Sequence, residues 1–233
     1  MSICYGGYIL KKVIKFDSEK EFKAYMKSKT VSEIGDGSEG VCYLGKDGKA
    51  YKSFQDGYIK STYQVDEIIT SDEASTNSFL FPDILFTIND IVVGYVCKFI
   101  PRDDLNFNKL IFEGLDHINF DKLYDAYGPL RNDAVVLAQN GISIFDLSYN
   151  LMFDGQSLYG IDTCSYTRKP GDLTDSNLAY VDAAMKDPFC LYFKEEYDID
   201  LDKDMEVKPF LKMVKKKYKE VAKDTPAQYA KKY

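Results

Sequence analysis

Short apolar runs separated by turn residues fill the first hundred positions of the chain. Five of them contain the β-branched and aromatic residues that favour strands, at 31–35, 41–45, 50–54, 84–88 and 91–100. Asp47-Gly48 lies between the second and third runs, and Asn89-Asp90 lies between the fourth and fifth. Such pairs are typical of tight turns that need positive φ angles. The pattern predicts two hairpins and a preceding strand, and residues 3–16 add one or two short strands.

Apolar positions recur at helical spacing in four other stretches. They lie at 58–71, 121–139, 176–186 and 206–222. Ser18 and Glu21 form a capping-box pattern that predicts a further helix ending near Lys27. Gly128-Pro129 is expected to break or kink the helix at 121–139, because proline removes a backbone donor. Short strands are expected at 142–145, 151–153 and 158–161.

The order of these elements predicts an α+β protein with two lobes. The β-rich lobe covers residues 1–100, and residues 1–30 either belong to it or form an added element. The α-rich lobe covers residues 101–233, with the link near Pro101. A chain of 233 residues is long enough for two such lobes around a cleft.

Composition excludes several classes of protein. A hydrophobic content of 45% is that of a globular chain, which excludes a disordered one. No apolar run reaches the roughly 20 residues of a membrane span, and no basic start precedes an apolar core, so we expect neither a span nor a signal peptide. The five cysteines are far apart and odd in number, which argues against a disulfide framework or a zinc site. We therefore expect a cytoplasmic protein.

Charge is unevenly distributed along the chain. The net charge of −7 argues against a general nucleic-acid binder. Residues 208–233 nevertheless contain nine lysines against Glu220 and Asp224. This basic stretch is either a solvated helix face or a docking surface.

A glycine-rich segment lies between the first two predicted strands of the hairpin region. Gly35, Gly37 and Gly40 fit the pattern G-x-G-x-x-G. A dinucleotide site needs these glycines between a strand and a helix, whereas here residues 41–44 continue as a strand. The glycines therefore favour either an ordinary turn or a flap whose backbone amides cover an anion such as a phosphate.

Lys52 is the first candidate for contact with that anion. Ala50 and Lys52 share one face of the predicted strand, because side chains alternate along a strand. A small residue and a lysine beneath a glycine flap fit a purine pocket with an ammonium at the phosphates; the alternative is an exposed strand lysine. A buried lysine needs a carboxylate partner. We expect Glu67 in this role, with Asp66 and Glu73 as alternatives.

Two carboxylates and an amide follow apolar strands in the second half. Asp146 begins a loop, Asn150 ends it, and Asp162 follows the returning strand. Hard oxygen ligands of this kind suit Mg²⁺, which is commonly held by one or two carboxylates together with substrate phosphates. Asp146 could orient and deprotonate an attacking hydroxyl. The alternative is that these residues only cap turns.

Taken together, these motifs resemble the protein-kinase-like fold, in particular its small, divergent bacterial and phage members. The resemblance spans roughly residues 31–168 and rests on Gly35, Gly37, Gly40, Ala50, Lys52, Asp146, Asn150 and Asp162. It implies a β-rich N-lobe and a reduced α-rich C-lobe around an ATP site.

The resemblance also implies a role for each matched residue. The flap amides would cover the ATP phosphates, and Lys52 would bridge them while pairing with Glu67. Asp146 would be the catalytic base, and Asn150 and Asp162 would bind Mg²⁺. The adenine would lie among the side chains of Val41, Ala50, Met152 and Ile161. Residues 98–100 would form the hinge.

The sequence departs from the kinase pattern at the catalytic loop. Asp146 and Asn150 are four residues apart, whereas kinases usually have five. Ile144-Phe145 replaces the His-Arg pair that precedes the aspartate, and no A-P-E motif follows. The shortened loop affects the placement of Asp146 more than that of Asp162.

We therefore expect an ATP- and Mg²⁺-dependent phosphotransferase acting on a Ser or Thr hydroxyl of a protein. A small-molecule acceptor, as in aminoglycoside or choline kinases, is one alternative. A pseudokinase that binds nucleotide or acts as a scaffold without turnover is another, and a plain α+β binding protein is a third. The sequence specifies neither the acceptor nor the oligomeric state.

Overall fold

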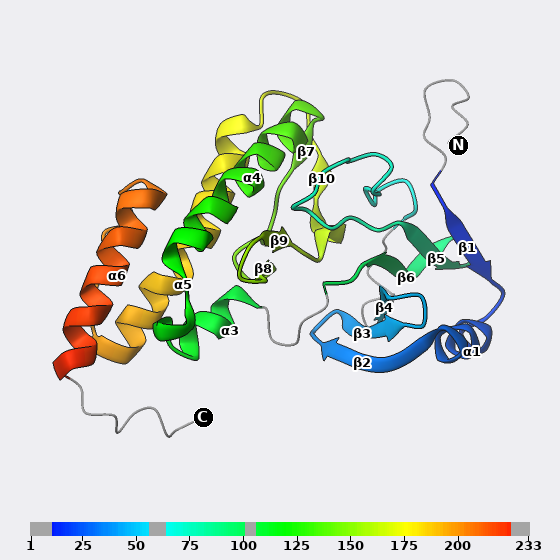
Figure 1. Cartoon of the computed structure of the whole chain (residues 1–233). Coiled ribbons are helices and arrows are strands. Elements are labelled where there is room, and N and C mark those ends of the chain that lie inside the picture. The colour runs from blue at the N-terminus through cyan, green and yellow to red at the C-terminus, as the bar shows by residue number, and fades with distance from the viewer. Residues whose placement is uncertain (1–10, 56–63, 101–105, 225–233) are drawn as a thin grey trace.

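The computed structural model describes residues 11–55, 64–100 and 106–224, and these form an α+β protein. A mixed sheet is built from the first part of the chain, and helices cover most of the second (Figure 1). The expected α+β class is confirmed, with strands concentrated before residue 100 and helices after it. No helix in the described ranges is both long and apolar enough to cross a bilayer.

The main sheet has six strands in the order β1-β5-β6-β4-β3-β2. Their bounds are β1 (Val13–Phe16), β2 (Thr30–Asp36), β3 (Gly40–Gly45), β4 (Lys49–Phe54), β5 (Ile84–Ile88) and β6 (Ile91–Lys98). β1 runs parallel to β5, and all other neighbours are antiparallel. The strands expected at 31–35, 41–45, 50–54, 84–88 and 91–100 are therefore confirmed, within a residue or two at most ends. Of the stretch 3–16, β1 is present, and residues 3–10 lie outside the described ranges.

Both predicted hairpins are present. Gly48 in the β3–β4 turn has a φ of +75°, and Asn89 and Asp90 in the β5–β6 turn have φ values of 52° and 63°. Glycine, asparagine and aspartate reach this left-handed region at the lowest energy, which is why these pairs predicted the turns. The first turn fixes the register of β4 on β3, and the long-range pairing of β4 with β6 places Lys52 opposite Tyr95.

Helix α1 (Glu19–Lys29) covers one face of the sheet. The side chain of Ser18 accepts a hydrogen bond from the backbone of Glu21, as the capping pattern predicted. Phe22 and Met26 are buried, and the ring of Phe22 lies 5.7 Å from that of Phe86 on β5. The opposite face of the sheet is therefore the one available to the rest of the chain.

The second part of the chain is built on helices. They are α3 (Phe107–Phe112), α4 (Phe120–Gln139), α5 (Thr174–Tyr197) and α6 (Val207–Asp224). Short strands connect them, namely β7 (Ile142–Ser143), β8 (Leu151–Phe153), β9 (Leu158–Gly160) and β10 (Thr167–Arg168). β8 pairs with β9, and β7 pairs with β10. This part holds the larger hydrophobic core.

Helix α4 continues through Pro129, so the prediction of a break there is wrong. Leu123, Leu130 and Leu137 are seven residues apart and fully buried on one side of the helix. Each buried leucine contributes about 2 kcal/mol. Together they outweigh the roughly 3 kcal/mol that a proline costs in a helix interior.

Helix α5 extends beyond the expected range of 176–186, because buried side chains again outweigh the cost of a proline. It passes through Pro188, and the helix continues because Phe189 and Phe193 beyond it are fully buried. The packing of these rings against the core therefore stabilises turns that local propensity does not predict.

The helix expected at 58–71 is not found in its described portion, residues 64–71, which forms turns; residues 58–63 lie outside the described ranges. Ile68 and Ile69 are both buried, but Ile68 packs under the sheet whereas Ile69 packs into the helical core. In an extended chain, the side chains of consecutive residues point to opposite sides. On a helix, consecutive residues lie about 100° apart, so they cannot point in opposite directions. The two isoleucines thus explain why this part is not helical.

The segment 69–81 leaves the sheet and packs into the helical half. The rings of Phe79 and Phe81 lie 6.0 and 5.9 Å from that of Tyr166. The backbone of Leu80 donates to Gly160 of β9 at 2.9 Å, and Gly160 donates to Ser78 at 2.7 Å. These contacts fix the end of β9 relative to the sheet.

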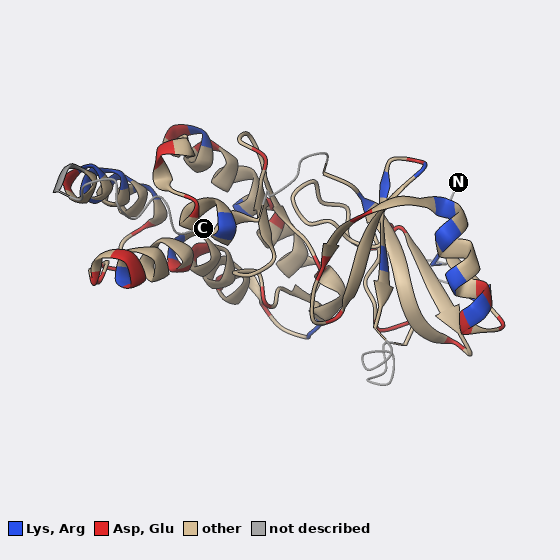
Figure 2. Cartoon of the chain, turned by 90° about the horizontal axis from the view of Figure 1, so that it is seen from below, with Lys and Arg blue, Asp and Glu red and all other residues tan. Residues whose placement is uncertain are grey.

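Lysines line the exposed side of α6 (Figure 2). Lys208, Lys212, Lys216 and Lys219 are exposed, whereas the apolar stripe of this helix is buried in the core. The described part of the basic stretch is therefore an exposed helix face, as both alternatives require.

Candidate functional site

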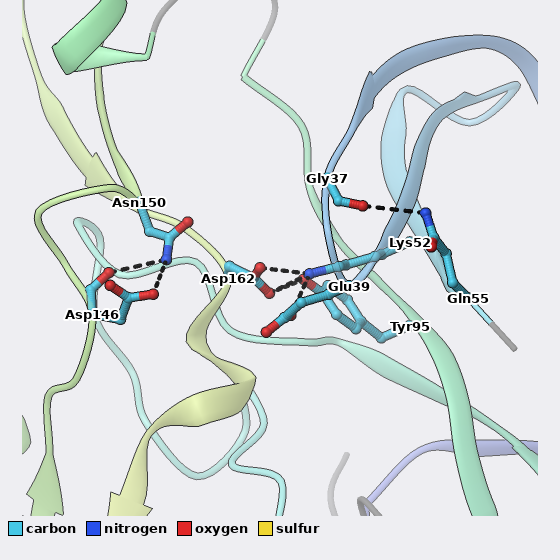
Figure 3. Close-up of polar contacts among 8 residues, drawn as sticks. All are labelled: Gly37, Glu39, Lys52, Gln55, Tyr95, Asp146, Asn150 and Asp162. Carbon is cyan, nitrogen blue, oxygen red and sulfur yellow. Dashed lines mark hydrogen bonds and ion pairs between the residues drawn. The ribbon is translucent and has the colours of Figure 1, made fainter. Parts of the chain in front are cut away.

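Lys52 on β4 and Asp162 just after β9 meet between the sheet and the helical half (Figure 3). Lys52 Nζ lies 2.5 and 2.6 Å from the two carboxylate oxygens of Asp162. Glu39 contributes a third oxygen, with Oε2 at 3.0 Å from the same nitrogen. The Tyr95 hydroxyl donates to Asp162 Oδ1 at 3.3 Å. The lysine is only 6% exposed, so these contacts are largely shielded from water.

The charges of these three side chains are strongly coupled. Burial alone would lower the pKa of Lys52, but the carboxylates of Asp162 and Glu39 raise it well above its ordinary value. The pKa of Asp162 is also raised, because burial and the Glu39 carboxylate outweigh the effect of the Lys52 ammonium. Two carboxylates around one ammonium leave one negative charge in excess among the three groups, which favours a cation at this position.

The backbone around Asp162 holds its side chain toward the sheet. Asp162 has a φ of 55° in the left-handed region, and a 3-10 turn follows it. The backbone of Ile161 donates to Asn150 at 2.8 Å, and the Thr163 hydroxyl donates to Leu80 at 3.2 Å. Left-handed backbone at a non-glycine residue costs about 1 kcal/mol or more and persists only where the surroundings hold it.

Asp146 and Asn150 lie at the two ends of one tight loop. Asn150 Nδ2 donates to the backbone oxygen of Asp146 at 2.9 Å and to its carboxylate at 3.4 Å. The Asn150 side-chain oxygen points away from Asp146 (Figure 3). Asp146 itself is exposed and also has a positive φ, of 52°. The amide therefore stabilises the loop while its oxygen faces outward.

A buried asparagine positions the strand before this loop. Asn177 of α5 is fully buried and accepts from the backbone of Ile144 at 3.0 Å. Its amide donates to Ile142 at 2.9 Å and to Ala134 of α4 at 3.3 Å. Asn177 thus ties the chain that leads into Asp146 to two helices, and sequence patterning gave no signal for it.

The glycine segment forms the turn between β2 and β3, a position that fits both an ordinary turn and the expected flap. The backbone of Gly37 donates to Gly40 at 3.0 Å, and the Gln55 side chain donates to Gly37 at 3.2 Å. A Cβ on Gly40 would lie 2.2 Å from the Ser53 carbonyl of β4, so this position requires glycine. Gly35 and Gly37 have open space around them. The fold itself therefore requires only the third glycine.

Glu67 does not pair with Lys52, contrary to the expectation. Its side chain is exposed, and its carboxylate accepts from the backbone of Gln64 at 3.0 Å. Of the two alternatives, Glu73 pairs with Lys11 and Arg168, and Asp66 is exposed. The turns formed by residues 64–71 hold Glu67 away from β4.

Glu39 takes the place expected for Glu67 beside Lys52. It lies between Gly37 and Gly40 in the flap. An acidic residue in a glycine-rich turn is usually solvated, so the sequence gave little sign of this pairing.

Apolar side chains gather beside the segment that leads into Asp162. Met152 and Ile161 belong to one cluster with Leu80 and Ile100. Ala50 shares the Lys52 face of β4, as the alternation of side chains predicted. Met152 and Ile161, the residues expected from the helical half, therefore pack in one cluster, and Ala50 lies on the sheet face that carries Lys52.

Val41 does not share the face of Ala50 and Lys52, so that part of the expectation is wrong. Val41 pairs with Ser53 across the β3–β4 ladder, whereas Cys42 pairs with Lys52. Paired residues point to the same side of a sheet, and neighbours along a strand point to opposite sides. Cys42 is therefore the residue of β3 on this face, and counting two residues onward from Gly40 would have found it.

No family model fits the sequence, and no curated protein is significantly similar to it. The described residues contain no group of three or more His, Cys, Asp or Glu side chains that could hold a metal ion.

Proposed function

We propose that this protein is an ATP- and Mg²⁺-dependent phosphotransferase with a two-lobed protein-kinase-like fold. The observation that carries the proposal is the contact of 2.5 Å between Lys52 of the sheet and Asp162 of the helical half. The two residues are 110 positions apart, and they meet next to a glycine flap. A lysine and a carboxylate converging in this way can bind a triphosphate and its divalent ion from opposite sides.

The nucleotide would lie between the sheet and the β8–β9 hairpin. Ala50 and Cys42 on the sheet side and Met152 and Ile161 on the other would enclose the adenine. The phosphates would extend beneath the flap toward Lys52. The open space around Gly35 and Gly37 supports this placement, because the fold itself does not require glycine there.

Asp162 and Asn150 are the residues that would hold Mg²⁺. Their oxygens are hard ligands, and the backbone hydrogen bond from Ile161 to Asn150 keeps the two segments together. The excess negative charge around Lys52 also fits a divalent cation. When bound, Mg²⁺ neutralises charge that develops on the transferred phosphoryl group. One carboxylate and one amide suit an ion that takes its other ligands from phosphates and water.

Asp146 would act on the acceptor hydroxyl. The acceptor oxygen forms a bond to the γ-phosphorus, the bond from that phosphorus to the β–γ bridging oxygen breaks, and ADP leaves. The hydroxyl proton goes to the Asp146 carboxylate. Positioning and charge neutralisation would supply most of the rate.

A protein Ser or Thr hydroxyl is the acceptor that the loop supports best. Asp146 is exposed, and so are its neighbours Phe145 and Tyr149, at 55% and 70%. An enclosed pocket around the aspartate would favour a small acceptor, whereas an open surface with exposed aromatic rings suits a polypeptide segment.

A pseudokinase is the second candidate, and the geometry of the loop favours it. The Asn150 amide is hydrogen-bonded to Asp146 across a loop one residue shorter than in kinases. This contact could hold Asp146 out of reach of an acceptor while leaving the nucleotide site intact.

Labelled ATP distinguishes these functions. The wild-type protein is incubated with ATP, Mg²⁺ and generic acceptor proteins beside Asp162→Ala, with Asp175→Ala on the exposed start of α5 as the control. A phosphotransferase loses incorporation only in Asp162→Ala, and equal incorporation in all three would refute the enzyme. Thermal stabilisation by ATP, expected at about 2.7 kcal/mol for a hundredfold excess over Kd, without any incorporation would support the pseudokinase.

A further inference from the structure

We propose that Glu39 regulates nucleotide binding by competing with the phosphates for the Lys52 ammonium. This inference rests on the proposed function, because it concerns the same lysine and the same flap. Glu39 would hold the flap against Lys52, and a nucleotide would bind only by displacing the carboxylate.

The position of Glu39 is fixed by its backbone. The backbone carbonyl of Glu39 accepts a hydrogen bond from the backbone N–H of Gln55 at 2.9 Å. The side-chain amide of Gln55 donates to the backbone carbonyl of Gly37, in the same turn, at 3.2 Å. From this anchored backbone the side chain extends to Lys52, where Oε2 lies 3.0 Å from Nζ (Figure 3). The carboxylate therefore lies between the flap and the lysine, where the phosphates are expected.

The donors of Lys52 are fully used in this arrangement. An ammonium has three N–H groups. Three carboxylate oxygens accept them, two from Asp162 and one from Glu39, all within 3.0 Å. A phosphate oxygen can reach the ammonium only if one of these three oxygens leaves.

Glu39 is the partner that can leave. The Asp162 backbone is held in the left-handed region and by its neighbours, and its carboxylate is the metal ligand of the proposed function. Glu39 lies in a flap with open space around Gly35 and Gly37, and its side chain is 24% exposed. It can rotate into water, and repulsion between its charge and the phosphates favours that movement.

This competition has a specific signature. Removing the Glu39 charge should strengthen binding of ligands that place phosphates at Lys52, and should do so more for ATP than for ADP. Adenosine does not reach the lysine, so its affinity should not change. A residue that merely stabilises the flap would change all three affinities together.

The test is titration calorimetry of the full chain with Mg·ATP, Mg·ADP and adenosine. Glu39→Gln and Glu39→Ala are compared with wild type. The matched control is Asp36→Asn, which removes the same charge from an exposed position in the same flap. We expect Glu39→Gln and Glu39→Ala to bind Mg·ATP about tenfold more tightly, equivalent to about 1.4 kcal/mol, and Asp36→Asn to stay within about twofold of wild type.

Other outcomes would overturn the inference in distinguishable ways. Unchanged or weaker Mg·ATP binding in both Glu39 variants, with wild type still binding, refutes the competition alone. A loss of affinity for Mg·ATP that is absent when ATP is titrated without Mg²⁺ would instead make Glu39 a metal ligand. If wild type and every variant fail to bind any nucleotide, the proposed function is wrong and the inference falls with it.

Discussion

Lys52 Nζ lies 2.5 Å from Asp162 Oδ1, although the two residues are separated by 110 positions and belong to different halves of the fold. Lys52 comes from a strand that is paired on both sides, with β3 through a hairpin and with β6 through a long-range ladder. Asp162 follows a short strand that is tied to the segment 78–80. The contact is thus supported by independent parts of the structure.

Replacing Lys52 with methionine should destabilise the fold. The substitution keeps the length of the side chain but leaves the Asp162 and Glu39 carboxylates next to each other without the ammonium. We expect a loss of about 3 kcal/mol in the free energy of unfolding, measured by urea denaturation at pH 7. Lys20→Met on the exposed side of α1 should change it by less than about 0.5 kcal/mol. The double variant Lys52→Met/Asp162→Asn should recover part of the loss, and no recovery would argue that the two side chains do not interact.

Glu73 should make the stability depend on acid pH. Burial raises the pKa of its carboxyl, but hydrogen bonds from Thr70 and the charges of Lys11 and Arg168 lower it below the ordinary value. A lowered pKa stabilises the folded state above the pKa of the unfolded chain, and this contribution is lost as the pH falls through the folded value. Glu73→Gln should therefore cost about 2 kcal/mol at pH 7 and progressively less below about pH 4.

Urea denaturation of wild type and Glu73→Gln at intervals from pH 3 to pH 7 measures this difference. Glu33→Gln on the exposed surface of β2 serves as the control. A difference between wild type and Glu73→Gln that stays constant over this range would show that the charge of Glu73 does not contribute.

Two glycines of the flap should respond differently to alanine. Gly40→Ala would place a methyl group 2.2 Å from the Ser53 carbonyl and push β3 away from β4, so we expect a loss of at least about 2 kcal/mol in stability. Gly35→Ala meets open space and should change stability by less than about 0.5 kcal/mol. Thermal unfolding of both variants provides the comparison, and equal effects would contradict the packing described for the flap.

Cys42 should report on the nucleotide. Burial raises the pKa of its thiol, so alkylation should be slow at pH 7 and accelerate as the pH rises. If adenine lies on the Ala50 face, Mg·ATP should slow labelling of Cys42 at least about fivefold. Peptide mass spectrometry resolves the sites, with Cys190 of α5 as the reference thiol. Unchanged labelling of Cys42 under saturating Mg·ATP would place the nucleotide elsewhere.

Local patterns predicted the parts of the fold that local chemistry determines. Asp47-Gly48 and Asn89-Asp90 predicted the hairpins because few residues accept a positive φ. Alternation along β4 placed Ala50 and Lys52 on one face, and the same rule applied to β3 would have selected Cys42 over Val41.

Long-range packing determines what the sequence could not predict. Pro129 lies within a continuous helix because three leucines of α4 are fully buried. Ile68 and Ile69 pack into two different hydrophobic clusters. The helix predicted at 58–71 assumed that both belong to one apolar face. Lys52 pairs with Glu39 rather than Glu67 because the register of the β3–β4 hairpin brings the flap above the lysine. The distance between Glu39 and Lys52 in the folded chain cannot be read from their spacing in the sequence.

The path of residues 76–81 has a practical consequence for dissecting the molecule. Phe79 and Phe81 precede the helices in the sequence, yet they fill part of the helical core beside Tyr166. A fragment that begins at residue 106 would lack both rings and the chain that pairs with Gly160, while the complementary fragment would expose them to water. Neither half should fold when expressed alone, and mixing the two should restore structure only by reassembling the whole.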